Sequence, residues 1–344
     1  MTDTGGRGRY GAPMLPSPHG WIILDKPIGL GSTQAVAAVK RNLREAGYGK
    51  VKVGHGGTLD PLASGVLPIA VGEATKLCGR MLDASKQYAF TIRFGEETDT
   101  LDAEGQVVAT SEHFPPLAAV AAVLPEFTGA IEQVPPAYSA LKVDGRRAYD
   151  RARAGEEVEL KTRAVTVHSL EPLSDMLRTD QAIDSSFAQS GGRPDPYDRR
   201  APLEVAESVT LLADVSKGTY IRSLARDIAR ALGTVGHVTM LRRLRAGPFT
   251  LENAISLDKL NEIAKGAPLT NVILPLEAGL DDIPALDLGP EQARAVRQGR
   301  VLTGLPQHDG LFWARSGKVP VALVELSGGE ARVVRGFNLS DVAE

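Results

Sequence analysis

A glycine-rich loop between two short apolar runs is the feature that most restricts how this chain can fold. Residues 51–53 and 67–71 form the apolar runs, and the stretch from Gly54 to Gly65 reads GHGGTLDPLASG. Short apolar runs bounded by glycine and proline are typical of strands, and glycine permits backbone angles and close contacts that other residues do not. The pattern therefore predicts a long loop held between two strands, with one carboxylate, Asp60, near its far end.

Two interpretations of Asp60 are open from the residues alone. An aspartate before a proline often forms an Asx turn, in which its carboxylate accepts a hydrogen bond from its own backbone. Alternatively, the carboxylate lies in the wall of a site, where the neighbouring glycines let a ligand approach the backbone. Spacing does not choose between the two.

The composition is that of a globular protein without a membrane span. Hydrophobic residues make up 43% of the chain and charged residues 24%, which is ordinary for a protein that buries a core. No apolar run approaches the roughly 20 residues of a membrane helix, and no apolar signal core opens the sequence. We therefore expect a cytoplasmic protein without membrane contact.

Cysteine and histidine usage argues against a metal site or a disulfide. Cys78 is the single cysteine, so an intrachain disulfide is excluded, and we expect it to pack as a small hydrophobe in a helix over residues 73–82. The six histidines show no metal-ligand spacing. The sequence predicts neither a metal nor a cofactor.

The charge distribution permits binding of nucleic acid even though the net charge does not favour it. The net charge is −3, whereas proteins that bind nucleic acid are usually basic. However, residues 40–52 contain five basic side chains and one acidic one, and residues 217–245 contain seven and one. A solvated helix face explains either patch, and so does contact with a phosphate backbone.

The first regular elements are a strand, a turn and a helix. Residues 21–24 are apolar, and the sequence DKPIG that follows them ends the strand. Ser32 can then cap a helix, because Val36, Val39 and Leu43 recur at helical spacing.

A later segment, residues 86–95, alternates with period two and predicts a strand. Tyr88, Phe90, Ile92 and Phe94 share one face, and Arg93 points the other way. On this pattern alone Tyr88 belongs to the core. The acidic loop over residues 98–105 that follows lacks the ligand number and spacing of an EF-hand.

Arg222 stands at the predicted start of another helix. A strand ends at Gly218, and Leu224, Ile228 and Leu232 form an apolar stripe beyond it. A cation at a helix N-terminus opposes the helix dipole by about 0.3 to 1 kcal/mol. This unfavourable placement indicates an anionic partner near Arg222.

Three stretches resemble motifs of one enzyme family, in the order in which that family has them. The sequence HGGTLDPLASGVLP at residues 55–68 is similar to the nucleophile motif of the TruB family of tRNA pseudouridine synthases. The sequences GTYIR at residues 218–222 and HVTMLRRLR at residues 237–245 match two further motifs. The resemblance covers roughly residues 18–260. It implies conversion of the T-loop uridine of tRNA, at tRNA position 55, to pseudouridine by base flipping, without a cofactor.

The same resemblance implies roles for individual residues. Asp60 would be the nucleophile and Arg222 would pair with it and keep it charged, because a neighbouring guanidinium favours the ionised form of a carboxylate. Tyr88 would pack against the target base and assist the chemistry. An Asp-rich loop beside the family's active site corresponds to the loop that contains Asp102, which makes this residue a further candidate.

Substrate binding is implied for a second group of residues. His55 would stack on the flipped nucleotide, Tyr220 would border the substrate with Tyr88, and Leu241 would close the base pocket. Lys26 lies in a turn that buttresses the active-site loop in the family. Further basic side chains would lie near phosphates or at sheet ends, namely Arg242, Arg243 and Arg245.

The fold that we expect is α+β, with a mixed, largely antiparallel sheet flanked by helices and a small C-terminal β-rich module similar to a PUA domain. Residues 1–17 would form a disordered tail and residues 18–280 the catalytic domain, with a flexible insertion at 174–205. Residues 281–344 would form the C-terminal module. Its seven basic and nine acidic residues do not favour strong RNA binding.

The expected partner is the T stem-loop of tRNA, and we expect a monomer. One rival is an RNA-binding or tRNA-folding protein without chemistry, which would tolerate loss of Asp60. Another is a nucleotide-dependent enzyme, but residues 54–57 follow neither a Walker pattern nor a dinucleotide fingerprint.

Overall fold

The computed structural model describes residues 15–139, 141–143, 145–156, 158, 160–173 and 205–339. The expected tail lies outside this range except for its last three residues, and the expected insertion lies outside it except for Val205. The chain divides into two compact units. The first comprises residues 1–61, 65–83 and 246–344, and the second comprises residues 62–64 and 84–245.

Antiparallel strands that are distant in sequence organise the first unit. Strand β1 (Gly20–Lys26) pairs with β3 (Ser64–Val71) along its whole length, and β2 (Val53–His55) pairs with the end of β3. Strand β14 (Ile255–Ser256) runs parallel to β1. The first unit therefore contains both kinds of strand pairing, and the predicted loop between two strands is confirmed as the β2–β3 connection.

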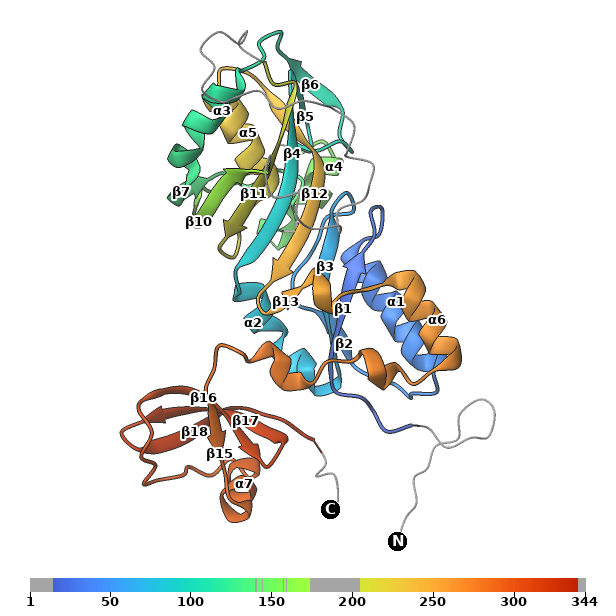
Figure 1. Cartoon of the computed structure of the whole chain (residues 1–344), viewed down its shortest axis with the longest axis vertical. Helices are drawn as coiled ribbons and strands as arrows, with labels where there is room; N and C mark the ends of the chain where they lie inside the picture. Colours follow the sequence, from blue (N-terminus) through green and yellow to red (C-terminus); the bar gives the residue numbers. More distant parts are fainter. Residues whose placement is uncertain are drawn as a thin grey trace. The chain divides into compact units, whose positions relative to one another are not determined.

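Helices and one further short strand accompany these strands in the first unit. They are α1 (Ser32–Glu45), η1 (Gly72–Leu77), α2 (Cys78–Asp83), β13 (Phe249–Thr250), η5 (Leu251–Asn253), α6 (Leu257–Gly266), η6 (Leu269–Val272) and η7 (Leu276–Gly279). Helices α1 and α6 lie side by side (Figure 1), joined by a hydrogen bond from Asn42 to Asn261 at 2.9 Å. The predicted apolar stripe of α1 is confirmed, because Val39 and Leu43 are buried and Val36 is half-buried while the basic side chains of the helix face solvent.

The C-terminal module is a small sheet with one helix. Strands β16 (Gly310–Ser316), β17 (Val319–Ser327) and β18 (Glu330–Gly336) pair antiparallel, and β15 (Ala285–Asp287) runs parallel to β16. Helix α7 (Pro290–Arg297) packs on this sheet and shares its apolar core. The β-rich character predicted for this region is confirmed, and the expected boundary at residue 281 stays a prediction.

The second unit contains a sheet with the strand order β12-β4-β11-β10-β7. These strands are β12 (Gly236–Ala246), β4 (Lys86–Phe94), β11 (Ser208–Val215), β10 (Arg163–Pro172) and β7 (Gly129–Gln133). Strand β4 confirms the predicted alternation, since Phe90, Ile92 and Phe94 are buried, Tyr88 is half-buried and Arg93 is exposed. Strands β4, β11, β10 and β7 pair antiparallel in succession, as expected for a largely antiparallel sheet.

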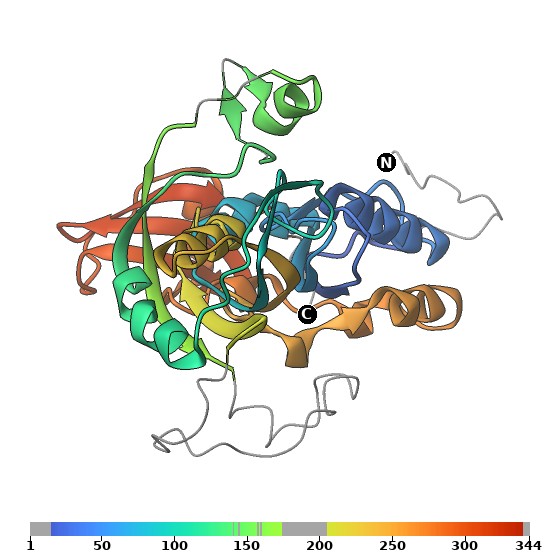
Figure 2. The same ribbon diagram turned by 90° about the horizontal axis from the view of Figure 1, so that it is seen from above.

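The other described elements of the second unit are helices and short strands. They are β5 (Glu96–Thr98), β6 (Val107–Thr110), α3 (Leu117–Val123), η2 (Leu124–Phe127), β8 (Lys142–Val143), β9 (Arg146–Arg147), α4 (Ala148–Arg153) and α5 (Ile221–Ala231). Helix α5 lies beside α3 (Figure 1) and buries Leu224 and Ile228. The β8–β9 ribbon and α4 project from the ends of β7 and β10 (Figure 2).

Polar contacts join the C-terminal module to η1 within the first unit. The Glu73 carboxylate accepts hydrogen bonds from the Asn338 backbone at 2.6 Å and from Lys76 at 2.7 Å. Lys76 also donates to the Gly336 carbonyl at 2.8 Å, and the Glu73 backbone N–H donates to His19 Nδ1 at 3.1 Å. Burial alone would raise the pKa of the Glu73 carboxyl, but the bonds from Asn338 and Lys76 outweigh it and leave this pKa below its ordinary value.

We expect acidification to weaken this contact, and we expect His19 to be protonated before Glu73 as the pH falls. Burial lowers the pKa of the His19 imidazole from its ordinary value of 6.5, so its contribution to stability is complete above that pH and is lost as the pH falls below it. Glu73 acts in the same direction at lower pH, because its depressed pKa contributes stability that disappears as the pH falls through the folded-state value. His19→Gln keeps an acceptor and removes one titration, so its Tm should fall less than the parent's between about pH 7.5 and about pH 5.5.

The control for this prediction is His168→Gln, since His168 is exposed on β10. This variant should lose Tm on acidification as the parent does. An identical pH dependence in the parent and in His19→Gln would contradict the role given to His19.

The described residues contain neither a helix that could span a membrane nor a metal-binding cluster. None of their helices is long and apolar enough to cross a membrane. No group of three or more His, Cys, Asp or Glu side chains among them could hold a metal ion.

Candidate active site

The loop that carries Asp60 is fixed at the residue before it. Ser32 Oγ accepts a hydrogen bond from the Leu59 backbone N–H at 2.8 Å and donates one to the Leu59 carbonyl at 3.0 Å. Both residues are buried. The expectation that Ser32 caps helix α1 is wrong: Gly31 is the N-cap residue, and the Ser32 hydroxyl is already engaged by the loop.

Ser32→Ala should therefore loosen the loop. The substitution leaves the buried Leu59 N–H and C=O without these partners, and each such loss costs about 1–3 kcal/mol. We expect the free energy of unfolding to fall by about 2 kcal/mol in denaturant titration, with a slower reaction at the adjacent Asp60. Thr33→Ala is the control, because Thr33 is exposed in the same helical turn. Equal stability of the two variants would contradict this role of Ser32.

A buried lysine ties the same loop to the turn after β1. Lys26 is completely buried, and its ammonium group donates to the carbonyls of Pro27 at 2.9 Å, Leu30 at 2.7 Å and Pro61 at 3.4 Å. The Gly29 backbone N–H also donates to Pro61 at 2.8 Å. Asp60, which is half-buried, thus lies between two anchored residues.

Steric constraints explain why several positions of the loop are glycine. A Cβ on Gly56 would lie 2.5 Å from the Cβ of Met81, so only glycine lets the loop approach α2 this closely. Gly57 and Gly65 have φ angles of 140° and 102°, which side-chain-bearing residues rarely adopt. The Gly57 N–H also contacts His55 Nδ1 at 3.4 Å, an arrangement in which that nitrogen acts as the acceptor.

In the second unit, Arg222 is held by a buried carboxylate and two carbonyls. Its guanidinium lies 3.2 Å from Asp102 Oδ2 and donates to the carbonyls of Thr100 at 2.8 Å and Tyr138 at 3.0 Å. Arg222 and Asp102 are 6% and 2% exposed, so the pair is screened little by solvent. The position of Arg222 at the start of a helix predicted an anionic partner, and Asp102 is such a partner.

The loop around Asp102 is itself constrained. Asp102 Oδ1 accepts hydrogen bonds from Thr100 Oγ1 at 2.6 Å and from the Glu104 backbone at 3.1 Å. Leu101, the residue before it, has a φ of 62°, which is uncommon for a residue with a side chain. The Leu101 carbonyl accepts a hydrogen bond from Val238 on β12 at 3.1 Å, which holds this conformation in place.

Two residues expected to line the base pocket lie on neighbouring strands. Tyr88 is half-buried on β4, and its hydroxyl lies 3.5 Å from the Arg243 guanidinium. Leu241 is buried on β12. Arg243, which was expected near phosphates or at a sheet end, lies on β12 with its side chain 1% exposed, so contact with a phosphate is disfavoured. Arg245 instead forms an ion pair with Asp214 on β11.

The projecting β8–β9 ribbon and α4 are basic, although several of their arginines already bind other side chains. Arg146 and Arg151 both bind Glu156, at 2.7 and 2.8 Å, and hold the pKa of its carboxyl below the ordinary value. The guanidinium groups of Arg147 and Arg153 lie over the ring of Tyr149, at 5.8 and 5.7 Å from its centroid. Tyr149 is half-buried, and an aromatic ring flanked by cations can stack on a base through the part that it leaves open.

The predicted site residues fall into two groups. Lys26, His55 and Asp60 belong to the first unit, whereas Tyr88, Tyr220, Arg222 and Leu241 belong to the second. The pairing of Arg222 with Asp60 stays a prediction.

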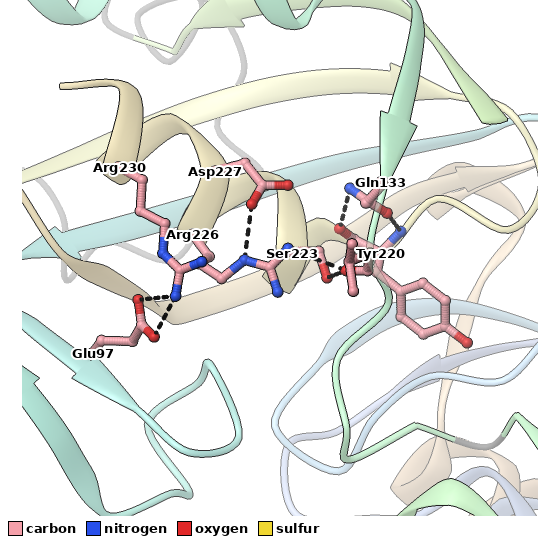
Figure 3. A network of polar contacts seen from close by, with 8 residues as sticks. Glu97, Gln133, Tyr220, Ser223, Arg226, Asp227 and Arg230 are labelled. Atoms are coloured by element: carbon pink, nitrogen blue, oxygen red, sulfur yellow. Dashed lines mark hydrogen bonds and ion pairs between the residues drawn. The ribbon is translucent and has the colours of Figure 1, made fainter. Parts of the chain in front are cut away.

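No sequence pattern indicated a role for Gln133, whose side-chain amide binds the backbone of Tyr220 (Figure 3).

Family models match segments that carry residues of both groups of predicted site residues. The model described as TruB family pseudouridylate synthase (N terminal domain) matches residues 43–189, and the model described as tRNA pseudouridylate synthase B C-terminal domain matches residues 222–281. The first range contains Asp60 and Asp102, and the second begins at Arg222.

Named relatives match over nearly the full chain. The tRNA pseudouridine synthase B of Novosphingobium aromaticivorans is 70% identical over 94% of this chain and 99% of its own length. The protein of the same name from Zymomonas mobilis is 55% identical over 94% and 99%. The chain belongs to the TruB family of pseudouridylate synthases.

Chains in two solved complexes share this fold. A chain in the structure of an H/ACA ribonucleoprotein bound to a substrate RNA containing 2′-deoxyuridine has a TM-score of 0.64 and 26% identity, covering 94% of this chain and 86% of its own. A chain of a Cbf5-Nop10-Gar1 complex has a TM-score of 0.63 and 27% identity, covering 92% and 84%. The expected pseudouridine synthase fold is confirmed by these similarities.

Proposed function

We propose that this chain is a tRNA pseudouridine synthase that isomerises the T-loop uridine at tRNA position 55. The observation that carries the proposal is the 70% identity, over 99% of its length, to a protein named tRNA pseudouridine synthase B. The nucleophile motif in this chain lies on a loop that Ser32 and Lys26 anchor on either side of Asp60.

The proposed substrate is the T stem-loop of tRNA, bound by a monomer in the cytoplasm. Exposed basic side chains on α1 support contact with the RNA backbone, and the Tyr149 ring on α4 supports contact with bases.

We assign residues 18–280 to the catalytic domain and residues 281–344 to a PUA-like module. The acidic balance of this module makes it a weak contributor to RNA affinity.

The reaction breaks the C–N glycosidic bond of uridine, rotates the base and rejoins it to the sugar through carbon. It is an isomerisation without net oxidation or reduction, since the proton lost from the ring carbon that joins the sugar is balanced by the proton that the released ring nitrogen gains. Flipping the uridine out of the folded loop costs about a few kcal/mol. Stacking on Tyr88 and His55, with Tyr220 and Leu241 bordering the base, would offset that cost.

Asp60 is the proposed nucleophile, and it adds either to the sugar or to the base. A carboxylate attacks only in its ionised form, and a nearby guanidinium stabilises that form in a site that excludes water. We assign this electrostatic role to Arg222. We assign Lys26 to holding the loop in place, because its ammonium group binds the Leu30 carbonyl in the turn after β1 and the Pro61 carbonyl in the loop.

The direct test is incubation of the purified protein with an unmodified tRNA transcript, followed by mapping of pseudouridine at single-nucleotide resolution. We expect modification at position 55 and none in a transcript with cytidine there. Modification elsewhere with position 55 untouched would overturn the proposed target, and binding without any modification would favour the RNA-binding alternative.

A further inference from the structure

The backbone of Tyr220 is clamped by one side-chain amide. Gln133 Nε2 donates to the Tyr220 carbonyl at 3.1 Å, and the Tyr220 N–H donates to Gln133 Oε1 at 2.8 Å (Figure 3). Gln133 ends strand β7 and is only 2% exposed. A glutamine amide carries a donor and an acceptor side by side, so it can bind the N–H and the C=O of one residue, as a residue on an antiparallel neighbouring strand does.

Tyr220 stands where the chain passes from β11 to α5. It is the N-cap residue of α5, and its own side chain makes no cap hydrogen bond. Its carbonyl accepts the first helical bond, from Leu224 at 3.0 Å, in addition to the bond from Gln133. The clamp thus acts at the residue that sets the direction in which the helix begins.

Neighbours of Gln133 hold the next residues of the helix. The Val134 carbonyl accepts hydrogen bonds from Ser223 Oγ at 2.8 Å and from Arg226 at 3.1 Å. The Tyr138 carbonyl accepts one from Arg222 at 3.0 Å. The segment after β7 therefore binds the first turn of α5 with polar contacts, while Leu224 and Ile228 supply its apolar packing.

We propose that Gln133 is a positioning residue for pseudouridine formation, which fixes the Tyr220 backbone so that the Tyr220 ring and the Arg222 guanidinium are held for the reaction. This inference rests on the proposed function. Burial of the apolar stripe already attaches α5 to the sheet. The clamp adds a fixed direction at the helix start, and small misplacements of reacting groups lower rates strongly.

Gln133→Met tests the proposal, because methionine has a similar length and shape but makes neither hydrogen bond. We expect the single-turnover rate on a tRNA transcript to fall about 10- to 100-fold while the Kd for tRNA changes less than about threefold. Gln292→Met is the matched control: Gln292 also binds an N-cap backbone, accepting from Gly289 at 3.0 Å at the start of α7. A Gln133→Met rate within twofold of the parent would overturn the proposal.

A double-mutant cycle with Arg222→Lys separates positioning from general loss of structure. If Gln133 acts through this helix start, Gln133→Met should reduce the rate of the Arg222→Lys protein by a smaller factor than it reduces the parent rate, because the part that acts through Arg222 is already lost and only the part that acts through Tyr220 remains. Additive losses would overturn the proposal. Gln133→Glu, which keeps the acceptor for the Tyr220 N–H and loses the donor, replaces Gln133→Met in both tests if the latter does not fold. Absence of pseudouridine with the parent protein would instead defeat the proposed function.

Discussion

Replacing Asp60 with asparagine should abolish pseudouridine formation and leave tRNA binding nearly unchanged. Asparagine has the same shape as aspartate and tolerates the same turn, but its neutral amide cannot serve as the nucleophile. Loss of a covalent nucleophile commonly lowers the chemical rate by more than about 10⁴-fold, equivalent to about 5 kcal/mol of barrier. Single-turnover assays measure the rate, and filter binding measures the Kd, which should stay within about threefold.

The control for this substitution is Asp258→Asn, because Asp258 is exposed in the first turn of α6. It should react at the parent rate. Turnover by Asp60→Asn within about tenfold of the parent would contradict the nucleophile assignment, and would favour a protein that binds tRNA without chemistry.

Replacing Asp102 with asparagine should slow the reaction about 100-fold. The amide keeps the shape of the carboxylate but removes the negative charge 3.2 Å from the buried Arg222 guanidinium. One side-chain oxygen remains to accept the hydrogen bond from Thr100, so the loop should persist. We expect the free energy of unfolding to fall by about 1–3 kcal/mol. Asp102→Ala should cost about 3–5 kcal/mol, because it leaves a buried cation without its carboxylate.

Glu97→Gln is the matched control for Asp102→Asn. Glu97 binds Arg230 on the same helix α5 at 2.9 Å, but the Arg230 side chain is 56% exposed. Exposed ion pairs contribute about 0–1 kcal/mol, so this variant should keep both the rate and the stability of the parent. Equal rate losses in Glu97→Gln and Asp102→Asn would show that the burial of the Arg222–Asp102 pair has no special importance.

Much of the local structure could be predicted because its causes are local. Alternation of apolar residues specifies β4, helical spacing specifies α1, and the glycine-rich stretch specifies the β2–β3 connection. The segment predicted as one helix over residues 73–82 became a 3-10 turn, η1, followed by the short helix α2. Contacts with His19 and the C-terminal module at η1 involve residues far away in sequence, and no local pattern reports them.

The sequence by itself identified the candidate nucleophile, because residues 55–68 resemble the family's nucleophile motif, whereas the spacing of the glycines and the proline alone left an Asx turn equally open for Asp60. Only the tertiary structure decided what holds the other side chains. Ser32 binds Leu59 rather than capping its own helix, Arg222 meets Asp102, and Gln133 reaches Tyr220 across 87 positions of sequence. Hydrogen-bonding side chains have many possible partners, and which one a buried group obtains depends on the strands and helices that folding brings beside it.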